Sequence, residues 1–253
     1  MFATGCTSLE KGDTIYQVSL LNALLQGEYD GFVSVGALKE HGEIGIGTFD
    51  TLDGEMIMLD GVVYKAKADG TVEVVSDDVL VPFAVVTPFV ADVLDTQTGA
   101  FLDIEELKTS LDSGISQTTG DFNRFYVAKV RGTFSHVRVR SVPSQEKPYQ
   151  PLSVIAESQR EFAYEQVEGT IVAFRSPDYV QGINLPGWHL HFLSKDGQKG
   201  GHLLEVSTTF SEVQIGDMRS FHLMLPSSGS FAAMDISEDR SEETQAIEGV
   251  VRP

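Results

Sequence analysis

The chain is poor in cysteine, in basic residues and in long hydrophobic runs. Its single cysteine, Cys6, excludes an intrachain disulfide and a metal cluster held by cysteines. Only 18 Lys and Arg residues stand against 37 Asp and Glu residues among 253, so the net charge is −19. That charge repels phosphate backbones and anionic lipids, and we therefore expect no nucleic-acid partner. The uncharged stretch at 79–91 contains two prolines and is too short for a membrane helix, so we predict no membrane span.

The N-terminus leaves two interpretations open. Cys6 follows the residues ATG, which are similar to the end of a bacterial lipoprotein signal, but the charged and apolar regions of such a signal do not precede it. We expect residues 1–12 to be a flexible N-terminal segment and the protein to be cytoplasmic. The alternative is export, or lipid anchoring through Cys6, if an upstream signal was trimmed.

The remaining composition, with 42% hydrophobic and 22% charged residues, is that of a globular protein. The pattern predicts an α+β fold with few helices, at 19–27, 103–114 and 151–163. Ser19 is expected to cap the first helix; Asp103 and Glu106 form a capping box for the second, and Gly114 ends it. Apolar, β-branched and alternating segments predict strands at 43–49, 55–67, 71–75, 125–130, 134–142, 170–174, 188–193, 202–207 and 219–225.

The two halves of the chain share an order of parts: a helix, a strand that starts with glycine, a loop and a β-hairpin. This order predicts two similar mixed β-sheet domains, although two unrelated α+β units would give the same order. The proline-containing segment 144–151 is the best boundary. We therefore expect an N-terminal α/β domain at 13–147 and a C-terminal α/β domain at 148–253.

One predicted hairpin brings three histidines together. His189 and His191 lie two residues apart on a strand and so point to the same face. Asp196-Gly197 is a strong signal for a two-residue turn. With that turn, residues that pair across the hairpin have numbers that sum to 393, which places His202 opposite His191. Neighbours across two strands lie about 5 Å apart at Cβ, so the three imidazoles converge.

Three converging histidines suit Zn²⁺, which is often held by three nitrogen ligands while a fourth position stays open for chemistry. The alternative is a surface strand with incidental histidines. A cupin is less well supported, because no carboxylate follows the His-x-His pair within 192–195. The sequence therefore predicts an active site around this hairpin in the C-terminal domain.

Two further segments carry candidate site residues. Glu55 leads directly into an apolar run, so its carboxylate lies either at a solvated strand end or in a cleft. The strand 134–142 alternates and puts His136, Arg138 and Arg140 on one face. The arginines either neutralise nearby carboxylates or bind an anionic substrate. His136 is better explained as a hydrogen-bonded or solvated histidine than as a fourth metal ligand.

Four motifs in this order resemble the α-acetolactate decarboxylase family of bacteria and archaea. They are GTFDTLDGEMIMLDG at 47–61, VRSVP at 139–143, GWHLHF at 187–192 and GGHLL at 200–204. The resemblance extends over about 16–249. It implies two related α/β domains and a homodimer. It also implies zinc-dependent decarboxylation of (S)-2-acetolactate to (R)-acetoin and CO₂ through a metal-chelated enediolate.

The resemblance also implies roles for individual residues. The family's zinc ligands match His189, His191 and His202. Its active-site glutamate and arginine match Glu55 and Arg140, and its Gly-Thr-Phe threonine matches Thr48, a residue of the substrate pocket.

A second active-site glutamate of the family best matches Glu248, with Glu242 and Glu243 close enough in sequence to compete. Two other functions remain open for the same scaffold. One is a three-histidine zinc hydrolase with Glu55 as the base, and the other is a non-catalytic metal-binding module.

Overall fold

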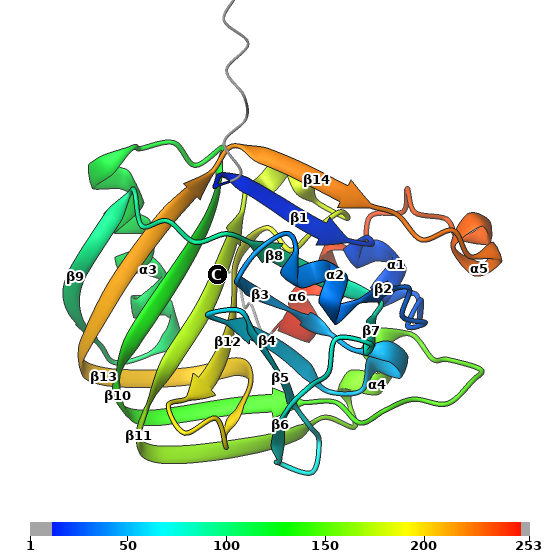
Figure 1. The fold of residues 1–253 in the computed structure, drawn as a ribbon, viewed down its shortest axis with the longest axis horizontal. Coiled ribbons are helices and arrows are strands. Elements are labelled where there is room, and N and C mark those ends of the chain that lie inside the picture. The colour runs from blue at the N-terminus through cyan, green and yellow to red at the C-terminus, as the bar shows by residue number, and fades with distance from the viewer. Residues whose placement is uncertain (1–11, 249–253) are drawn as a thin grey trace, which may run out of the picture.

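The computed structural model describes residues 12–248 and has a mixed α+β fold that is made mostly of strands (Figure 1). Cys6 and nearly all of the predicted flexible segment 1–12 lie outside the described residues. No helix within 12–248 is both long enough and apolar enough to cross a membrane.

A mixed sheet of seven strands forms one layer. Its order is β14-β1-β8-β3-β4-β5-β6, so strands from the two ends of the chain lie side by side at one edge (Figure 1). β1 pairs with β14 in parallel and the other neighbours are antiparallel. The strands are β1 (Thr14–Val18), β3 (Ile44–Thr48), β4 (Glu55–Leu59), β5 (Val62–Ala66), β6 (Val72–Val74), β8 (Phe83–Thr87) and β14 (Ser220–Met224).

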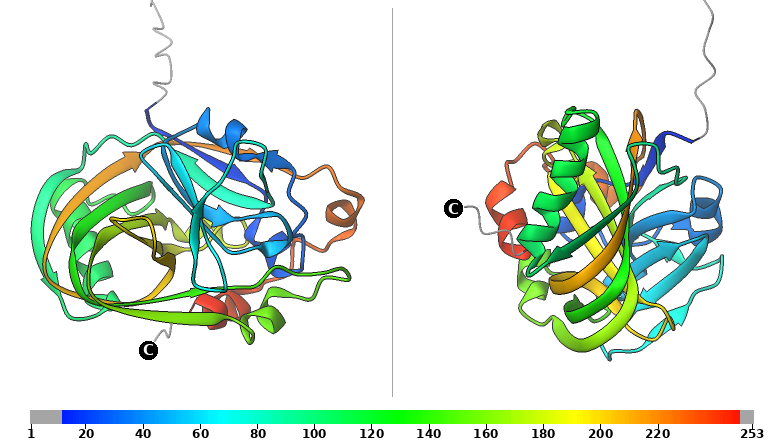
Figure 2. Two further views of the ribbon diagram at one scale, coloured as in Figure 1. Left: turned by 60° about the horizontal axis from the view of Figure 1, so that its bottom comes forward. Right: turned by 90° about the vertical axis from the view of Figure 1, so that its left-hand side faces the viewer.

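A second sheet, antiparallel and five-stranded, has the order β10-β11-β12-β13-β9. Its long strands curl until β10 also pairs with β13, which closes the sheet on itself (Figure 2). The strands are β9 (Leu94–Phe101), β10 (Phe125–Ser141), β11 (Arg160–Ser176), β12 (Gly187–Ser194) and β13 (Gly200–Met218). A third sheet has two short strands, β2 (Val33–Ser34) and β7 (Leu80–Val81).

The helices are short except for one. α3 (Ile104–Thr118) packs on the curled sheet with Leu107, Leu111 and Ile115 fully buried. The others are α1 (Leu21–Leu25), α2 (Val35–Lys39), α4 (Leu152–Ala156), α5 (Gly229–Ala233) and α6 (Ser241–Glu248), with 3-10 turns at Asp50–Leu52 and Asp178–Val180. α4 and α6 contact each other, and α1 contacts α4.

The alternation of side chains on β12 separates two apolar cores. Trp188, Leu190 and Phe192 point into the core beneath α3. The opposite face carries Leu193, which packs in the core between the two sheets. Because His189 and His191 share this second face, both imidazoles lie between the sheets rather than on an outer surface.

Two predicted helix ends are wrong. Ser19 does not cap α1: the cap position is Leu20, with no side-chain hydrogen bond, and Ser19 itself has φ +62°. Asp103 caps α3 as predicted, accepting from the amide of Glu106. However, α3 continues past Gly114, because Gly114 and Ile115 are buried against the sheet and packing outweighs the glycine signal.

The predicted helix at 151–163 is also wrong beyond its first turns. α4 ends at Ala156, and Phe162 lies on β11 opposite Val139 of β10. The apolar spacing fitted a helix, but this segment instead pairs its backbone with a neighbouring strand. The separate strands predicted at 125–130 and 134–142 are one strand, β10, since pairing with β11 continues across Gly132.

Strands from both sides of residues 147 and 148 share each large sheet. β9 and β10 precede the predicted boundary yet pair within the five-stranded sheet, and β14 follows it yet joins β1. The division into similar domains at 13–147 and 148–253 remains a prediction about folding units, and the sheets do not follow it.

Candidate metal centre

The β12–β13 hairpin has the predicted register. His191 pairs with His202, and Leu193 pairs with Gly200, so paired numbers sum to 393. Gly201 has φ +146°, and a Cβ there would lie 2.6 Å from the carbonyl oxygen of Arg140. Glycine before His202 therefore lets β13 approach β10 closely and places His202 beside Arg140.

The three imidazoles converge on one point. His189 Nε2 lies 3.1 Å from His202 Nδ1 and 3.2 Å from His191 Nε2. One ligand atom from each residue lies within 4.8 Å of the other two. Nitrogens bound at 2.0–2.1 Å to a tetrahedral Zn²⁺ are about 3.3 Å apart, so the observed spacing fits a metal ion of this size.

A backbone contact orients one of these rings. His191 Nδ1 lies 2.9 Å from the carbonyl oxygen of Met56 on β4 and donates to it. The bond leaves Nε2 without a proton and directed at the other two histidines, which is the arrangement found around metal-bound histidines. The seven-stranded sheet thus fixes a ligand that the five-stranded sheet carries.

Burial keeps the cluster neutral. Desolvation, and after it the positive charge of Arg140, lowers the pKa of His189 to about 3. Desolvation is also the largest cause that lowers the pKa of His191 and His202 well below its usual range. Neutral imidazole is the form that binds a metal, so the cavity presents its ligands in the right state at neutral pH.

Glu55 lies beside the cluster. It is the first residue of β4 and pairs with Thr48 on β3. Its Oε2 is 3.7 Å from His191 Nε2, and its side chain is only 13% exposed. The buried Thr48 hydroxyl donates to the carbonyl oxygen of Gly54 at 2.8 Å and so fixes the backbone directly before Glu55.

Arg140 enters the same cavity from β10. It is 6% exposed and pairs in register with His202. Its Nη1 donates to the carbonyl oxygen of Ile247 at 2.6 Å and to Gln159 Oε1 at 3.1 Å. A fixed guanidinium within a cluster of neutral imidazoles and one carboxylate gives the cavity a positive centre for an anion.

The other two residues predicted on that strand face do not join the cluster. Arg138 forms ion pairs with Glu161 and Glu205. His136 Nδ1 lies 2.8 Å from Glu165 Oε1, in agreement with the interpretation of His136 as a hydrogen-bonded histidine. Glu248 is the last residue of α6, and its side chain lies outside the described part of the structure.

A cavity of about 60 Å³ joins these groups. Polar side chains line one part of it: Thr48, Glu55, Arg140, His189 and His202. The rest is apolar: Leu24, Leu52, Phe83, Val142, Leu152, Ala156 and Ile247, with Gly47. The sequence interpretation missed these apolar residues and the Met56 carbonyl, because core residues and backbone atoms carry no chemical motif.

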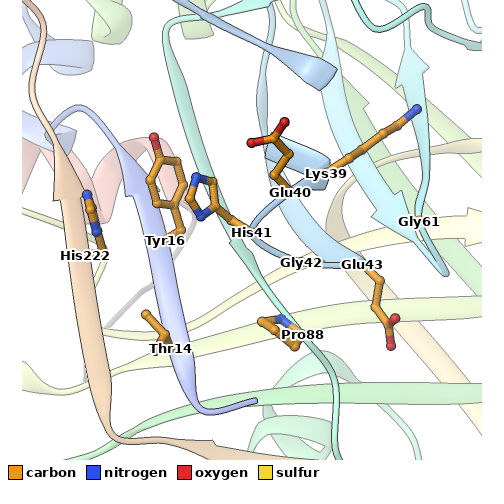
Figure 3. A pocket seen from close by; sticks show the side chains of 10 residues that line it. All are labelled: Thr14, Tyr16, Lys39, Glu40, His41, Gly42, Glu43, Gly61, Pro88 and His222. Carbon is orange, nitrogen blue, oxygen red and sulfur yellow. The ribbon is translucent and has the colours of Figure 1, made fainter. Parts of the chain in front are cut away.

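A larger pocket of about 570 Å³ lies on the seven-stranded sheet (Figure 3). There, Tyr16 stacks on His41 with 3.7 Å between ring centroids, and the His41 and His222 centroids are 6.3 Å apart. Among the side chains that the structure describes, at 12–94 and 99–247, the triad of His189, His191 and His202 is the only group of three or more His, Cys, Asp or Glu residues with ligand atoms close enough to share a metal.

Comparison with known sequences gives one family. The family model described as Alpha-acetolactate decarboxylase matches residues 15–238. The chain is 43% identical over 237 residues to a protein of that name from Methanosarcina mazei, covering 93% of this chain and 80% of the relative. It is 40% identical to one from Methylococcus capsulatus, covering 92% and 88%.

Solved structures agree with this. The crystal structure of alpha-acetolactate decarboxylase from Bacillus subtilis strain 168 matches with a TM-score of 0.85 and 32% identity, covering 93% of this chain and 98% of that one. A Staphylococcus aureus protein of unknown function, described as similar to alpha-acetolactate decarboxylase, matches with a TM-score of 0.86 and 30% identity, covering 93% and 100%.

Proposed function

Because the chain belongs to the alpha-acetolactate decarboxylase family, we propose that it converts (S)-2-acetolactate to (R)-acetoin and CO₂. One observation carries the proposal: three neutral histidines, a carboxylate and an arginine meet in one small cavity. In the reaction, the bond from C2 to the carboxylate breaks, its electron pair stays on the substrate, and one proton is added at C2.

We propose zinc as the resident ion, held by His189, His191 and His202. The spacing of the three nitrogens and the all-nitrogen donor set support this choice. When bound, the ion supplies a Lewis acid that stabilises negative charge on the substrate oxygens as CO₂ leaves.

Arg140 is proposed to bind the substrate carboxylate. Its guanidinium is planar and always charged, which suits a carboxylate, and its bond to the Ile247 carbonyl holds it in place. Holding the carboxylate fixes the direction in which CO₂ departs. Arg140 also adds a positive charge to a protein whose net charge of −19 would otherwise repel an anionic substrate.

Glu55 is proposed to deliver the proton to C2. Its partial burial and its position beside His191 support this role, since a carboxyl group must reach the reacting carbon from one defined side to give a single enantiomer. Thr48 is proposed to line the substrate pocket and to position Glu55 through Gly54. Glu248 is the alternative proton donor.

Two further proposals concern assembly and location. We expect a homodimer, as the family resemblance implies, and a cytoplasmic protein. Sedimentation of the purified protein tests the first, and fractionation of the source cells tests the second.

The decisive experiment is an assay of acetoin release from racemic 2-acetolactate, with metal content measured on the same sample. We expect release of (R)-acetoin, its loss after chelation, and its recovery on addition of Zn²⁺. Protein with a full complement of zinc that releases no acetoin would overturn the proposed function. Faster hydrolysis of esters or lactones would favour a hydrolase, and zinc binding with no turnover would favour a binding module.

A further inference from the structure

The catalytic cavity adjoins a second, more open pocket, and the two share lining residues. This outer pocket has a volume of about 410 Å³ and is lined by residues of β10, α4, β11 and α6. Three residues line both spaces: Arg140, Ala156 and Ile247. Arg140 is held by hydrogen bonds to Gln159 and to the Ile247 carbonyl oxygen, and the other two shared residues, Ala156 and Ile247, are apolar.

The apolar surface of the catalytic cavity must receive the alkyl groups of the substrate. The proposed substrate has a carboxylate, a hydroxyl group and a ketone, and these match the polar part of the cavity. What remains are methyl groups, including the substituent on C2. An alkyl group buried against apolar side chains is stabilised in proportion to the apolar surface that it removes from water.

The apolar lining residues differ in what lies behind them. Leu24 sits in α1, where all five residues are buried, so the space behind it is filled by the core. Ile247 has the same exposure as Leu24, 8%, but the outer pocket lies on its other side. Removing part of Leu24 would leave a closed hole, whereas removing part of Ile247 would connect the cavity to the outer pocket.

From this we infer that Ile247, with Ala156, sets the length of the C2 alkyl substituent that the cavity accepts. The inference rests on the proposed function, because it assigns a size limit to that same site. It makes Ile247 a specificity-determining residue: its carbonyl oxygen holds Arg140 while its side chain closes the alkyl end of the cavity. The two roles are separable, since a change of side chain keeps the carbonyl.

The test compares kcat/KM for 2-acetolactate with that for homologues carrying ethyl or propyl in place of the C2 methyl group. In Ile247→Ala, we expect the ethyl-to-methyl ratio of kcat/KM to rise about tenfold or more, and the propyl homologue to become a substrate. Leu24→Ala is the matched control, with the same truncation in the same cavity, and we expect it to accept the ethyl but not the propyl homologue.

Enlarging a side chain shared by the two pockets should have the opposite effect to truncating Ile247. Ala156→Val makes such a change and should lower kcat/KM for the ethyl homologue more than for 2-acetolactate. Ile247→Val serves if the alanine variant does not fold, with a smaller shift in the same direction. Metal content and Tm of each variant show whether a change in rate reflects a damaged site instead of a changed size limit.

Binding gives a readout that does not require turnover. Calorimetry with 2-hydroxy-2-alkyl carboxylates, which lack the ketone, should show affinity falling with alkyl length in the wild type and not in Ile247→Ala. If both Ile247→Ala and Leu24→Ala turn over the propyl homologue, or if neither does, the inference is overturned. Failure of the proposed function is distinguishable, because zinc-loaded wild type would then release no acetoin while the binding series could still be measured.

Discussion

Histidines gather in two regions of this protein, and only one of the regions is arranged as a metal site. In the cavity between the sheets, the ring centroids of His189, His191 and His202 are 4.9–5.4 Å apart and their nitrogens meet. In the pocket of Figure 3, His41 and His222 are 6.3 Å apart, and His41 lies flat on Tyr16.

The difference shows that pocket size is a poor guide to chemistry here. The pocket of Figure 3 is about 570 Å³ and the cavity about 60 Å³, yet the small one holds the converging ligands. Burial disfavours the charged imidazolium and so keeps the imidazoles neutral, and the Met56 carbonyl orients one of them. The two regions therefore differ in the burial, convergence and orientation of their imidazole rings more than in the volume of their pockets.

The largest difference between the two regions is expected when one histidine is removed from each. His202→Ala should lose the metal and reduce acetoin formation to the uncatalysed level while the fold is retained, because two histidines and a water bind Zn²⁺ far more weakly. Metal analysis, circular dichroism and the acetolactate assay measure this. His222→Ala is the control and should keep both metal and rate; full zinc content in His202→Ala would refute the site.

A smaller effect is expected when the carboxyl group of Glu55 is replaced by an amide of the same shape. Glu55→Gln should keep the metal and lower kcat by about 10²–10⁴-fold, as expected for loss of a group that transfers a proton. The measurement is kcat at constant zinc content. An unchanged kcat would transfer the proton-donor role to Glu248.

The burial of the cluster can be measured by its effect on stability. A buried neutral histidine has a lower pKa in the folded than in the unfolded chain, so the unfolded chain binds more protons below pH 6.5. Metal-free protein should therefore lose stability as the pH falls from about 6.5 towards 3, by about 1.4 kcal/mol per pH unit for His189. Denaturant unfolding of His189→Asn should show a shallower decline, and parallel declines would contradict the assignment.

The smallest effect is expected in the pocket of Figure 3. His41→Ala removes the ring that stacks on Tyr16 with an interplanar angle of 4°. We expect a loss of about 1 kcal/mol in the free energy of unfolding, which is typical of a stacked pair, with metal content and kcat unchanged. A loss of metal in this variant would mean that the two regions are coupled.

The sequence predicted the hairpin well because its information is local. The Asp196-Gly197 turn sets the register, and the strand period then fixes which faces meet, so His191 opposite His202 follows without knowledge of the rest. The same reasoning gave the correct cap at Asp103. The order of motifs along the chain likewise indicated the family to which the chain belongs.

Features that depend on distant contacts were not predictable in this way. The segment around Phe162 has helical spacing but pairs with β10, and β9 (Leu94–Phe101) is mostly polar and carries little strand signal of its own. β1 and β8 are rich in β-branched and aromatic residues, and they were left out of the predicted strands although their composition favours strands. Ile247 is an apolar residue in a mostly polar helix, and only the packing of α6 beside α4 brings it to the cavity. For the Phe162 segment, β9 and Ile247, a partner far along the chain determines the structure, which local patterns do not encode.

The parallel pairing of β1 with β14 has a consequence for how the chain is made. Thr14 pairs with Ser220, so during synthesis β1 cannot complete this pairing until β14, far along the chain, has left the ribosome. Such long-range pairing slows folding, because a large loop must close before the contact forms. Until β14 is available, one edge of β1 has unpaired backbone groups that could pair with another chain.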